Sequence, residues 1–345
     1  MRVLVTGLGT YWGSRVAKAL EALDEVEVVV GVDTRDPVVP LERTEFVRAD
    51  SSFSILNRIV QATQVDTIVH THLIVDSTKL RSGTLHEINV IGTMNLLAAA
   101  GAADSPVRKV VLKSSTLVYG STYQDPYFFR EETRRVRGAH TPVERSLLEV
   151  SGFVRDFAED NPHVTVTKLR FSNVLGEGVD TPFTKAFRRP VVPEIFGFDP
   201  RMQFTHEDDV IGALVYGIVH DVPGVYNVAG DGTLPWSEVC AIVGKPRVPL
   251  SPVATDLAAR PLRAAGLLDL PPELLDLLRY GRGVDNSRYK RAGYRYEFTS
   301  FGTIQAFARA LRLEHVVGDA RPQYRYERDV EQFFRHSPAV VHQVD

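Results

Sequence analysis

Short apolar strands alternate with amphipathic helices along the first half of the chain. Residues 2–6 (RVLVT) form a β-branched run, and residues 14–23 place Val16, Leu20 and Leu23 on one helical stripe. The same alternation predicts further strands at 26–33, 45–50, 65–70, 108–115 and 164–171, and helices at 53–62, 87–100 and 142–159. Strands that are apolar along their whole length suit a parallel sheet covered by helices on both faces.

The composition of the sequence changes after Gly178. Segments rich in proline and glycine, such as 182–200 and 244–252, are interrupted by short helices. We therefore expect an α/β fold in which a Rossmann-type doubly wound parallel sheet is joined to a smaller C-terminal α/β domain that binds the substrate. The expected boundaries are 1–177 with 203–230 for the first domain, 178–202 with 231–317 for the second, and 318–345 for a tail without a core role.

Composition narrows the class of protein. A chain of 345 residues exceeds the ~250 to 300 residues that one hydrophobic core supports, which agrees with two domains. The net charge of −3 creates no general attraction to nucleic acid or anionic lipid, so neither is an expected partner. No apolar run approaches the ~18 residues of a membrane helix, and no signal-like segment follows Met1. With Cys240 as its one cysteine, the chain is expected to be cytoplasmic and without an internal disulfide.

A glycine turn between the first strand and the first helix predicts a dinucleotide site. Gly7, Gly9 and Gly13 let the backbone approach a pyrophosphate, and the helix N-terminus supplies free amides. The next strand ends in Asp33, and 33 − 13 = 20 residues matches the ~20 expected for an acid that binds ribose hydroxyls. A carboxylate repels a ribose phosphate, which favours NAD over NADP unless Arg35 turns toward that phosphate.

The expected cofactor site extends along the carboxyl ends of the following strands. Asp50 either caps the adenine or is a turn residue, and His72 is expected on the nicotinamide side. His70 and His72 lack a third ligand at a suitable spacing, so no metal is expected. The expected cofactor-binding set is Gly7, Gly9, Thr10, Tyr11, Trp12, Gly13, Asp33, Arg35, Asp50, Ser51, His70, Thr71, His72, Asn89, Lys113 and Arg145.

Five further motifs follow one another in a fixed order. They are NVIGTMN at 89–95, SSTLVYG at 114–120, LRFSNVLG at 169–176, QFTHEDDV at 203–210 and YNVAG at 226–230. Together with the glycine turn they resemble the extended short-chain dehydrogenase/reductase family, the NAD-dependent epimerases and dehydratases of nucleotide sugars. The resemblance covers roughly residues 1–230. It implies a Rossmann domain, NAD as cofactor and transient oxidation of a nucleotide sugar.

The resemblance also implies substrate contacts at strand ends. Ser115 lies at the carboxyl end of a parallel strand, where its hydroxyl is expected to bond a substrate oxygen. Asn173 either meets a sugar or diphosphate or makes an Asx turn, and Arg201 is a third expected contact. Asp208 and Asp209 lie in the first turn of a helix, where acids favour the dipole, and are expected to be structural.

The pattern breaks at the residues that the family uses for proton transfer. Family members carry a Tyr-x-x-x-Lys pair on the helix that starts here at Pro142, and counting back from Glu149 places those roles at Thr141 and Arg145. The hydroxyl of threonine has too high a pKa to act as a base near neutrality, and a guanidinium is not equivalent to an ammonium. His140 is the expected alternative for moving a proton. The family's middle glycine also falls on Thr10.

Two other features have simpler interpretations. The basic stretch at 130–137 contains Glu131 and Glu132, so we expect a solvated loop that could still reach a nucleotide diphosphate. Tyr324 and Tyr326 in the tail resemble a stacking patch, but packing or a subunit contact is expected because the chain is not basic.

Three functions stay open at the level of the sequence. The first is an atypical NAD-dependent epimerase or dehydratase acting on a nucleotide sugar, similar to a UDP-sugar 4-epimerase and expected to form a homodimer. The second is a non-catalytic NAD-binding scaffold or sensor that lost its chemistry with the Tyr-Lys pair. The third is a reductase or dehydrogenase of a lipid-like substrate, based on the leucine-rich segment at 262–278.

Overall fold

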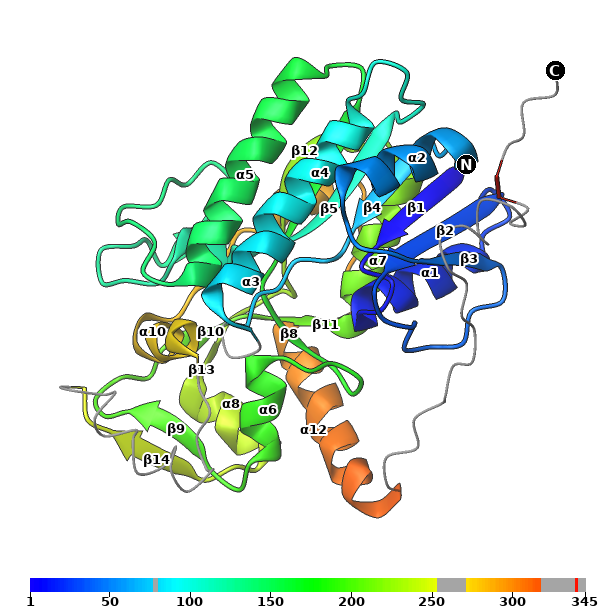
Figure 1. Ribbon diagram of the computed structural model, residues 1–345. Coiled ribbons are helices and arrows are strands. Elements are labelled where there is room, and N and C mark those ends of the chain that lie inside the picture. Colours follow the sequence, from blue (N-terminus) through cyan, green and yellow to red (C-terminus); the bar gives the residue numbers. More distant parts are fainter. Residues whose placement is uncertain (77–79, 253–270, 318–338, 341–345) are drawn as a thin grey trace, which may run out of the picture.

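A computed structural model describes residues 1–76, 80–252, 271–317 and 339–340 (Figure 1). Its centre is a seven-stranded sheet in the order β12-β7-β5-β4-β1-β2-β3, in which every neighbouring pair is parallel. These strands are β1 (Arg2–Thr6), β2 (Val28–Asp33), β3 (Thr44–Arg48), β4 (Thr67–His70), β5 (Lys109–Ser115), β7 (Thr165–Phe171) and β12 (Gly224–Val228). The predicted Rossmann-type α/β fold is confirmed. The strand order reverses between β1 and β4, where open α/β sheets bind ligands at the carboxyl ends of their strands.

Helices cover both faces of the sheet (Figure 1). On one face are α2 (Phe53–Thr63), α3 (Ser82–His86), α4 (Gly92–Ala100) and α5 (Pro142–Asp160), and on the other are α1 (Tyr11–Glu21) and α7 (Glu207–Val219). Successive side chains of a strand point to opposite faces. Val110 and Leu112 of β5 therefore join the core under α4 and α5, whereas Val111 joins the core under α7.

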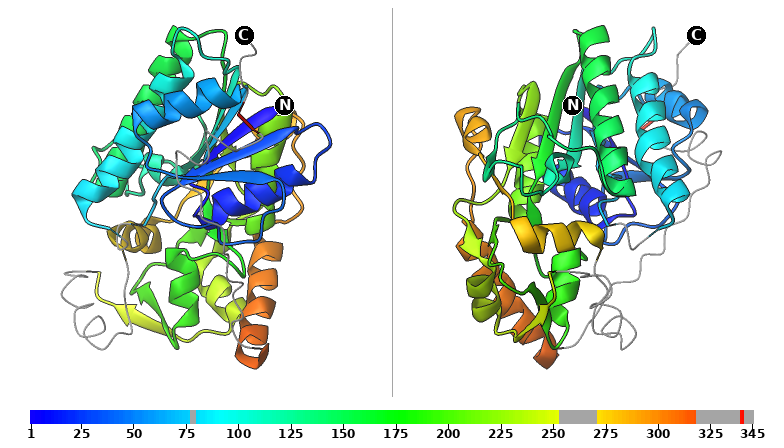
Figure 2. Two further views of the ribbon diagram at one scale, coloured as in Figure 1. Left: turned by 45° about the vertical axis from the view of Figure 1, so that its right-hand side comes forward. Right: turned by 90° about the vertical axis from the view of Figure 1, so that its left-hand side faces the viewer.

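A second body lies beneath the sheet in both views of Figure 2. Its core is rich in aromatic rings: Phe183, Phe187 and Trp236 contact one another, and Phe187 also contacts Phe307. It contains α6 (Pro182–Arg188), β9 (Val192–Ile195), β10 (Arg201–Met202), β13 (Leu234–Pro235), α8 (Trp236–Val243), β14 (Arg247–Leu250), α10 (Pro272–Tyr280) and α12 (Ser300–Val317). The domain boundaries stay predictions.

Short elements connect the two bodies. β8 (Asn173–Leu175) pairs with β11 (Phe204–His206), and β6 (Phe128–Phe129) pairs with β15 (Gly283–Val284). The remaining elements are the 3-10 helix η2 (Thr116–Tyr119) and the helix α11 (Ser287–Arg291). No helix among the described residues is both long and apolar enough to cross a bilayer.

The structure differs from the sequence-based predictions in the helix at 87–100 and in the tail. The helix expected at 87–100 begins earlier, as α3, and passes through a π-helical turn, η1 (Glu87–Ile91), before α4. The tail does contribute to the core, because Ala339 is buried and its carbonyl oxygen accepts a hydrogen bond from Nη2 of Arg2 (2.7 Å). Residues 262–270 and Tyr324 and Tyr326 lie outside the described residues.

Candidate functional site

The glycine turn after β1 has no room for a side chain at three positions. Gly7 has a left-handed φ of 79°, and a Cβ atom there would lie 2.7 Å from the Cβ atom of His72. A Cβ atom at Gly9 would lie 2.5 Å from the carbonyl oxygen of Arg35, and one at Gly13 would overlap the carbonyl oxygen of Gly7. The turn therefore requires glycine at all three positions.

Thr10 closes the turn in the place of the family's middle glycine. Its hydroxyl donates to the carbonyl oxygen of Gly7 (2.7 Å) and accepts from the backbone N–H of Gly13 (3.1 Å). It is thus the N-cap of α1. A glycine at this position would lack the cap, so the departure from the family pattern replaces backbone freedom with a side-chain hydrogen bond.

Asp33 lies at the carboxyl end of β2, directly beside this turn. Its Oδ2 atom accepts from the backbone N–H of Gly9 (3.1 Å), and its Oδ1 atom accepts from the backbone N–H of Arg35 (2.9 Å). The carboxylate is buried, whereas the Arg35 side chain is 66% exposed with its Nε atom 3.8 Å from Oδ1. The acid is therefore held rigidly where a ribose bound at the turn would meet it.

His72 packs against the glycine turn, and its expected place on the nicotinamide side stays a prediction. It contacts Gly7, and its nearest charged neighbours are Asp33 and Arg35. Burial lowers the pKa of His72, the Asp33 carboxylate opposes that shift, and Arg35 adds to it. The residue thus lies beside the glycine turn, within electrostatic reach of Asp33 at the end of β2.

His70 and Thr71 hold the ends of β1 and β4 together. Both ring nitrogens of His70 bond hydroxyls, Nδ1 with Thr6 (2.6 Å) and Nε2 with Thr93 (3.0 Å). Thr71 donates its hydroxyl to the carbonyl oxygen of Thr6 (2.9 Å). We expected His70 to contact the cofactor, but it is only 2% exposed, and its polar atoms are committed to the interior. The described residues contain no group of three or more potential metal ligands.

The polar residues after β3 and β4 stabilise loops. Asp50 is exposed and accepts from the backbone N–H of Ser52 (3.0 Å), which is the turn interpretation of this residue. The carbonyl oxygen of Ser51 accepts from the Asn95 amide (2.9 Å). The buried Asn89 amide bonds both backbone polar groups of Ile74 (2.8 Å each). These contacts set the path of the loops that border the site.

Asn89 also joins the α4 region to α5. Its Nδ2 atom donates to the hydroxyl of Ser146 (3.1 Å), and it lies in the π-helical turn η1 that the sequence did not predict. A π-helical turn inserts one residue into a helix and is common at functional sites. Here it turns the Asn89 side chain toward the loop after β4.

Ser115 is the last residue of β5 and is half-buried. Its hydroxyl accepts from the backbone N–H of Leu117 (3.2 Å) and so caps η2. The hydroxyl hydrogen stays available for an oxygen atom of a ligand. Two residues earlier, Lys113 is buried, and its ammonium nitrogen lies 5.0 Å from the ring centre of Trp12.

The start of α5 is organised as a helix cap. The Thr141 hydroxyl accepts from the backbone N–H of Glu144 (3.2 Å), and the Glu144 carboxylate accepts from the backbone N–H groups of Thr141 (3.4 Å) and His140 (2.8 Å). Thr141 is only 3% exposed, so its expected catalytic position is occupied by a structural residue. His140 and Arg145 are both exposed.

The basic stretch at 130–137 is not entirely solvated, which corrects the expectation of a solvated loop. The Arg135 side chain is 8% exposed, and its Nη2 atom pairs with Glu144 at 2.7 Å. Its guanidinium lies over Gly120, where a Cβ atom would come within 2.8 Å of Cζ. The other arginines of the predicted solvated loop, Arg130, Arg134 and Arg137, are exposed.

The two remaining predicted substrate contacts lie at the junction of the two bodies. Asn173 begins β8, and its amide donates to the carbonyl oxygen of Gln203 (3.0 Å), a contact between β8 and the segment before β11. Arg201 is exposed in β10, and its carbonyl oxygen accepts from the backbone N–H of Arg282 (3.3 Å). The structure thus assigns both residues backbone contacts, and their contact with a substrate stays a prediction.

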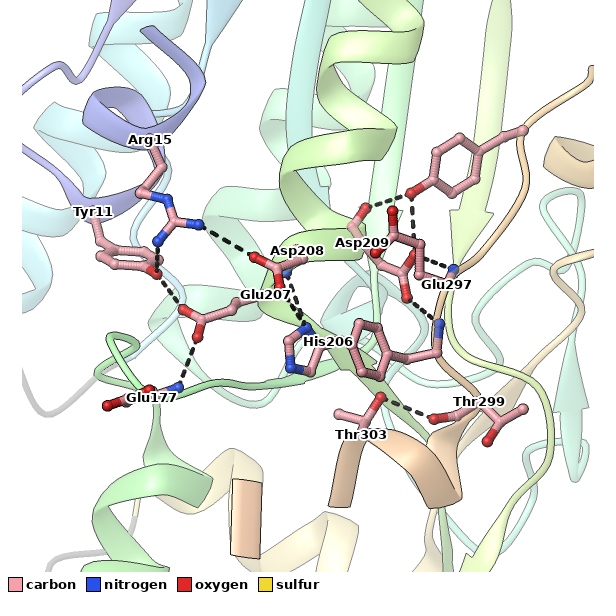
Figure 3. A network of polar contacts seen from close by, with 12 residues as sticks. Tyr11, Arg15, Glu177, His206, Glu207, Asp208, Asp209, Glu297, Thr299 and Thr303 are labelled. Atoms are coloured by element: carbon pink, nitrogen blue, oxygen red, sulfur yellow. Dashed lines mark hydrogen bonds and ion pairs between the residues drawn. The ribbon is translucent and has the colours of Figure 1, made fainter. Parts of the chain in front are cut away.

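A polar network ties the first turn of α1 to the first turn of α7 (Figure 3). The Tyr11 hydroxyl donates to the Glu207 carboxylate, which also accepts from the backbone N–H of Glu177 (2.8 Å). Arg15 bonds the Tyr11 oxygen (3.1 Å) and pairs with Asp208 (3.2 Å). Burial, followed by Glu207, raises the pKa of Tyr11. The phenol therefore stays protonated as a hydrogen-bond donor.

The same helix start is tied to the segment before α12. The Asp209 carboxylate accepts from the backbone N–H groups of Glu297 (2.8 Å) and Phe298 (3.1 Å) (Figure 3). The His206 ring stacks on Phe298, with ring centres 3.8 Å apart. Asp209 thus has the structural role expected for it, although it acts on a distant backbone segment as well as on the helix dipole.

Glu207 and Glu144 are the site residues that the sequence analysis missed. Glu207 directly precedes Asp208 and Asp209 in the QFTHEDDV segment, and this run of three acids was the available signal. Two glycines lie against Glu207 and its partner Tyr11. A Cβ atom at Gly176 would overlap the Glu207 carboxylate, and one at Gly178 would come within 2.6 Å of the Tyr11 ring. Glu144 follows the Thr-Pro helix start at the third helical position, the spacing of a capping box.

The chain is similar to known proteins in sequence and in fold. The sequence pattern of the NAD dependent epimerase/dehydratase family matches residues 3–229. An uncharacterized protein of Mycobacterium tuberculosis is 34% identical over 327 residues, which is 92% of this chain and 86% of that protein. The UDP-glucose 4-epimerase of Yersinia enterocolitica is 26% identical over 189 residues, 51% of this chain and 54% of that enzyme.

A solved structure shares the fold at low sequence identity. UDP-glucuronic acid 4-epimerase from Bacillus cereus, determined in complex with NAD, has a TM-score of 0.68 and 19% identity. The alignment covers 91% of this chain and 99% of that enzyme. Both bodies of the chain are therefore included in the structural similarity.

Proposed function

Because the chain belongs to the NAD-dependent epimerase/dehydratase family, we propose that it is an enzyme that oxidises and re-reduces a nucleotide sugar within one site. NAD, the family's cofactor and the one expected from Asp33, supplies reversible hydride acceptance when bound. One observation carries the proposal. The glycine turn, capped by Thr10, holds Asp33 beside the N-terminus of α1 through the backbone N–H of Gly9.

Different residues along the carboxyl edge of the sheet are proposed to bind different parts of the cofactor and the substrate. The free amides at the start of α1 bind the diphosphate, and the Asp33 carboxylate accepts from the ribose hydroxyls. The Ser115 hydroxyl donates a hydrogen bond to the oxygen of the sugar hydroxyl whose carbon is oxidised. Asn173 and Arg201, on the side of the second body, are proposed to hold the rest of the nucleotide sugar.

Because Thr141 stands at the family's tyrosine position, another residue is needed to accept the proton that the sugar hydroxyl releases on oxidation. We assign this step to His140, which is exposed at the start of α5 and directly precedes the family's tyrosine position. Asp276 of α10 interacts electrostatically with His140, and burial, followed by the charge of Glu144, raises the pKa of Asp276. Histidine is the side chain that most often transfers protons in general acid–base catalysis.

The test separates cofactor binding from turnover. We expect the purified protein to bind NAD more tightly than NADP, and Asp33→Asn to weaken NAD binding roughly tenfold or more, the range for hydrogen bonds to a charged group. Asp50→Asn, an exposed turn residue, is the matched control. Incubation with UDP-glucose or UDP-glucuronic acid should then produce the 4-epimer or a dehydrated sugar, detected by chromatography and mass spectrometry. Absence of NAD binding would contradict the proposal.

Specific observations favour one alternative, a non-catalytic NAD-binding protein. Thr141 is committed to a helix cap, and Arg145 is exposed. This alternative predicts that NAD stabilises the fold but that no sugar is converted. Variant Thr141→Tyr/Arg145→Lys should then gain conversion that the wild type lacks. The lipid-substrate alternative loses part of its basis, because Leu274, Leu275, Leu277 and Leu278 of α10 are buried in the core.

We also propose a homodimer through α4 and α5. A shallow pocket between these helices is lined by apolar residues that include Met94, Leu97 and Phe153. Met94 is 40% exposed and Ile91 on the preceding turn is 41% exposed, which is typical of a surface covered by a partner. Light scattering should give twice the chain mass, and Met94→Asp should give the monomer.

A further inference from the structure

The start of α5 does not supply an interior cation. Arg145, at the position that the resemblance assigns to the family's lysine, is exposed. Its guanidinium makes no hydrogen bond or ion pair with any residue that the structure describes. The cation at this helix position is therefore a solvent-exposed guanidinium rather than an enclosed ammonium.

A buried lysine lies at the carboxyl edge of the sheet instead. Lys113, near the end of β5, is 5% exposed. Its ammonium nitrogen lies 5.0 Å from the ring centre of Trp12 and 5.8 Å from that of Phe171. Trp12 belongs to the first turn of α1, and Phe171 is the last residue of β7. The charge is thus enclosed between the cofactor helix and two strand ends.

Lys113 and Ser115 share one face of β5. Side chains two residues apart in a strand point the same way, and the register confirms the spacing, since Lys113 is opposite Leu169 and Ser115 opposite Phe171 on β7. The ammonium and the proposed substrate-binding hydroxyl are therefore neighbours on the α1 side of the sheet.

The topology places this pair on the nicotinamide half of the site. Asp33 ends β2, on one side of β1, and the glycine turn follows β1 itself. A dinucleotide whose ribose meets Asp33 and whose diphosphate meets the turn continues over β4 and β5 on the other side. We propose that Lys113 is the fixed cation of the nicotinamide half, replacing the lysine that the family carries on α5. The inference rests on the proposed function.

A cation at this place has a measurable consequence. The oxidised nicotinamide ring carries one more positive charge than the reduced ring, so a nearby ammonium disfavours NAD relative to NADH. For unit charges a few ångströms apart in a protein, this effect amounts to roughly tenfold or more in the ratio of dissociation constants. Binding therefore tests Lys113 without any substrate.

The experiment compares two uncharged variants of similar length. Dissociation constants for NAD and NADH are measured by fluorescence and calorimetric titration for the wild type, Lys113→Met and Arg145→Met. We expect the wild type to bind NADH more tightly, Lys113→Met to lose that preference by roughly tenfold, and Arg145→Met to keep it. A Lys113→Arg variant retains the charge and should retain the preference, at least in part.

Every outcome bears on the inference. A preference that is unchanged in Lys113→Met but lost in Arg145→Met would return the role to α5 and overturn it. If Lys113→Met does not fold, Lys113→Gln replaces it, and an unchanged preference there has the same meaning. A wild type that binds neither dinucleotide overturns both this inference and the proposed function, whereas tight binding with no dependence on Lys113 overturns the inference alone.

Discussion

Thr141, which the resemblance places at the family's tyrosine position, has a structural role in this chain. Its hydroxyl caps α5 through the backbone N–H of Glu144. We predict that Thr141→Ala lowers the free energy of unfolding by about 1 kcal/mol, the usual effect of losing a cap, and that Thr141→Ser has little effect. Urea denaturation measures both. A Thr141→Ala protein that is fully stable would contradict the cap.

Glu144 is a buried carboxylate that compensates a buried guanidinium. Arg135 and Glu144 are 8% and 4% exposed, and Nη1 of Arg135 has no hydrogen-bond partner among the described residues. Glu144→Ala leaves that charge buried without its anion, so the free energy of unfolding should fall by about 3 to 5 kcal/mol. Asp156→Ala, which removes an exposed partner of Arg155, should cost less than about 1 kcal/mol. Equal losses in the two variants would argue against burial as the cause.

At the scale of elements, the hydrogen bond between Tyr11 and Glu207 connects two helix starts. Tyr11→Phe removes the hydroxyl group, so the Glu207 carboxylate loses this donor and keeps the hydrogen bond from the backbone N–H of Glu177. We expect a loss of about 1.5 to 3 kcal/mol, as for hydrogen bonds to charged groups. Hydrogen exchange should increase in the loop at 176–178, which packs on this pair. Arg15→Ala, at a side chain 37% exposed, is the matched control and should have a smaller effect.

At the scale of the whole molecule, His70 couples folding to pH. Burial, with a smaller contribution from His72, lowers the pKa of His70 to about 3, from an unfolded value of ~6.5. Between these values the unfolded chain binds more protons, so stability is complete above pH ~6.5 and falls as pH decreases toward 3. One such group contributes up to ~1.4 kcal/mol per pH unit. His70→Gln should make the decrease in the urea midpoint between pH 6.5 and 4.5 less steep, whereas exposed His163→Gln should not.

Elements that depend on local sequence were predictable, whereas features that depend on contacts between distant segments were not. The strands and helices of the first half were predictable because each element has the hydrophobic periodicity of its type and is bounded by local signals, such as the Thr-Pro start of α5. The π-helical turn at Asn89 was not predictable, because it depends on the backbone of Ile74 in a separate loop. The burial of Ala339 likewise depends on Arg2, at the opposite end of the chain.

The sequence by itself determined the Rossmann sheet, the glycine turn and the acid at Asp33, because these depend on periodicity and on spacings within one βαβ unit. Only the tertiary structure decided that His72 packs against the glycine turn, that the Arg135 side chain is buried, and that Tyr11 meets Glu207, 196 residues away. It also decided that Lys113 rather than Arg145 is enclosed beside α1. Such contacts depend on how distant segments pack, and packing sets the burial of each charge, which no local pattern in the sequence records.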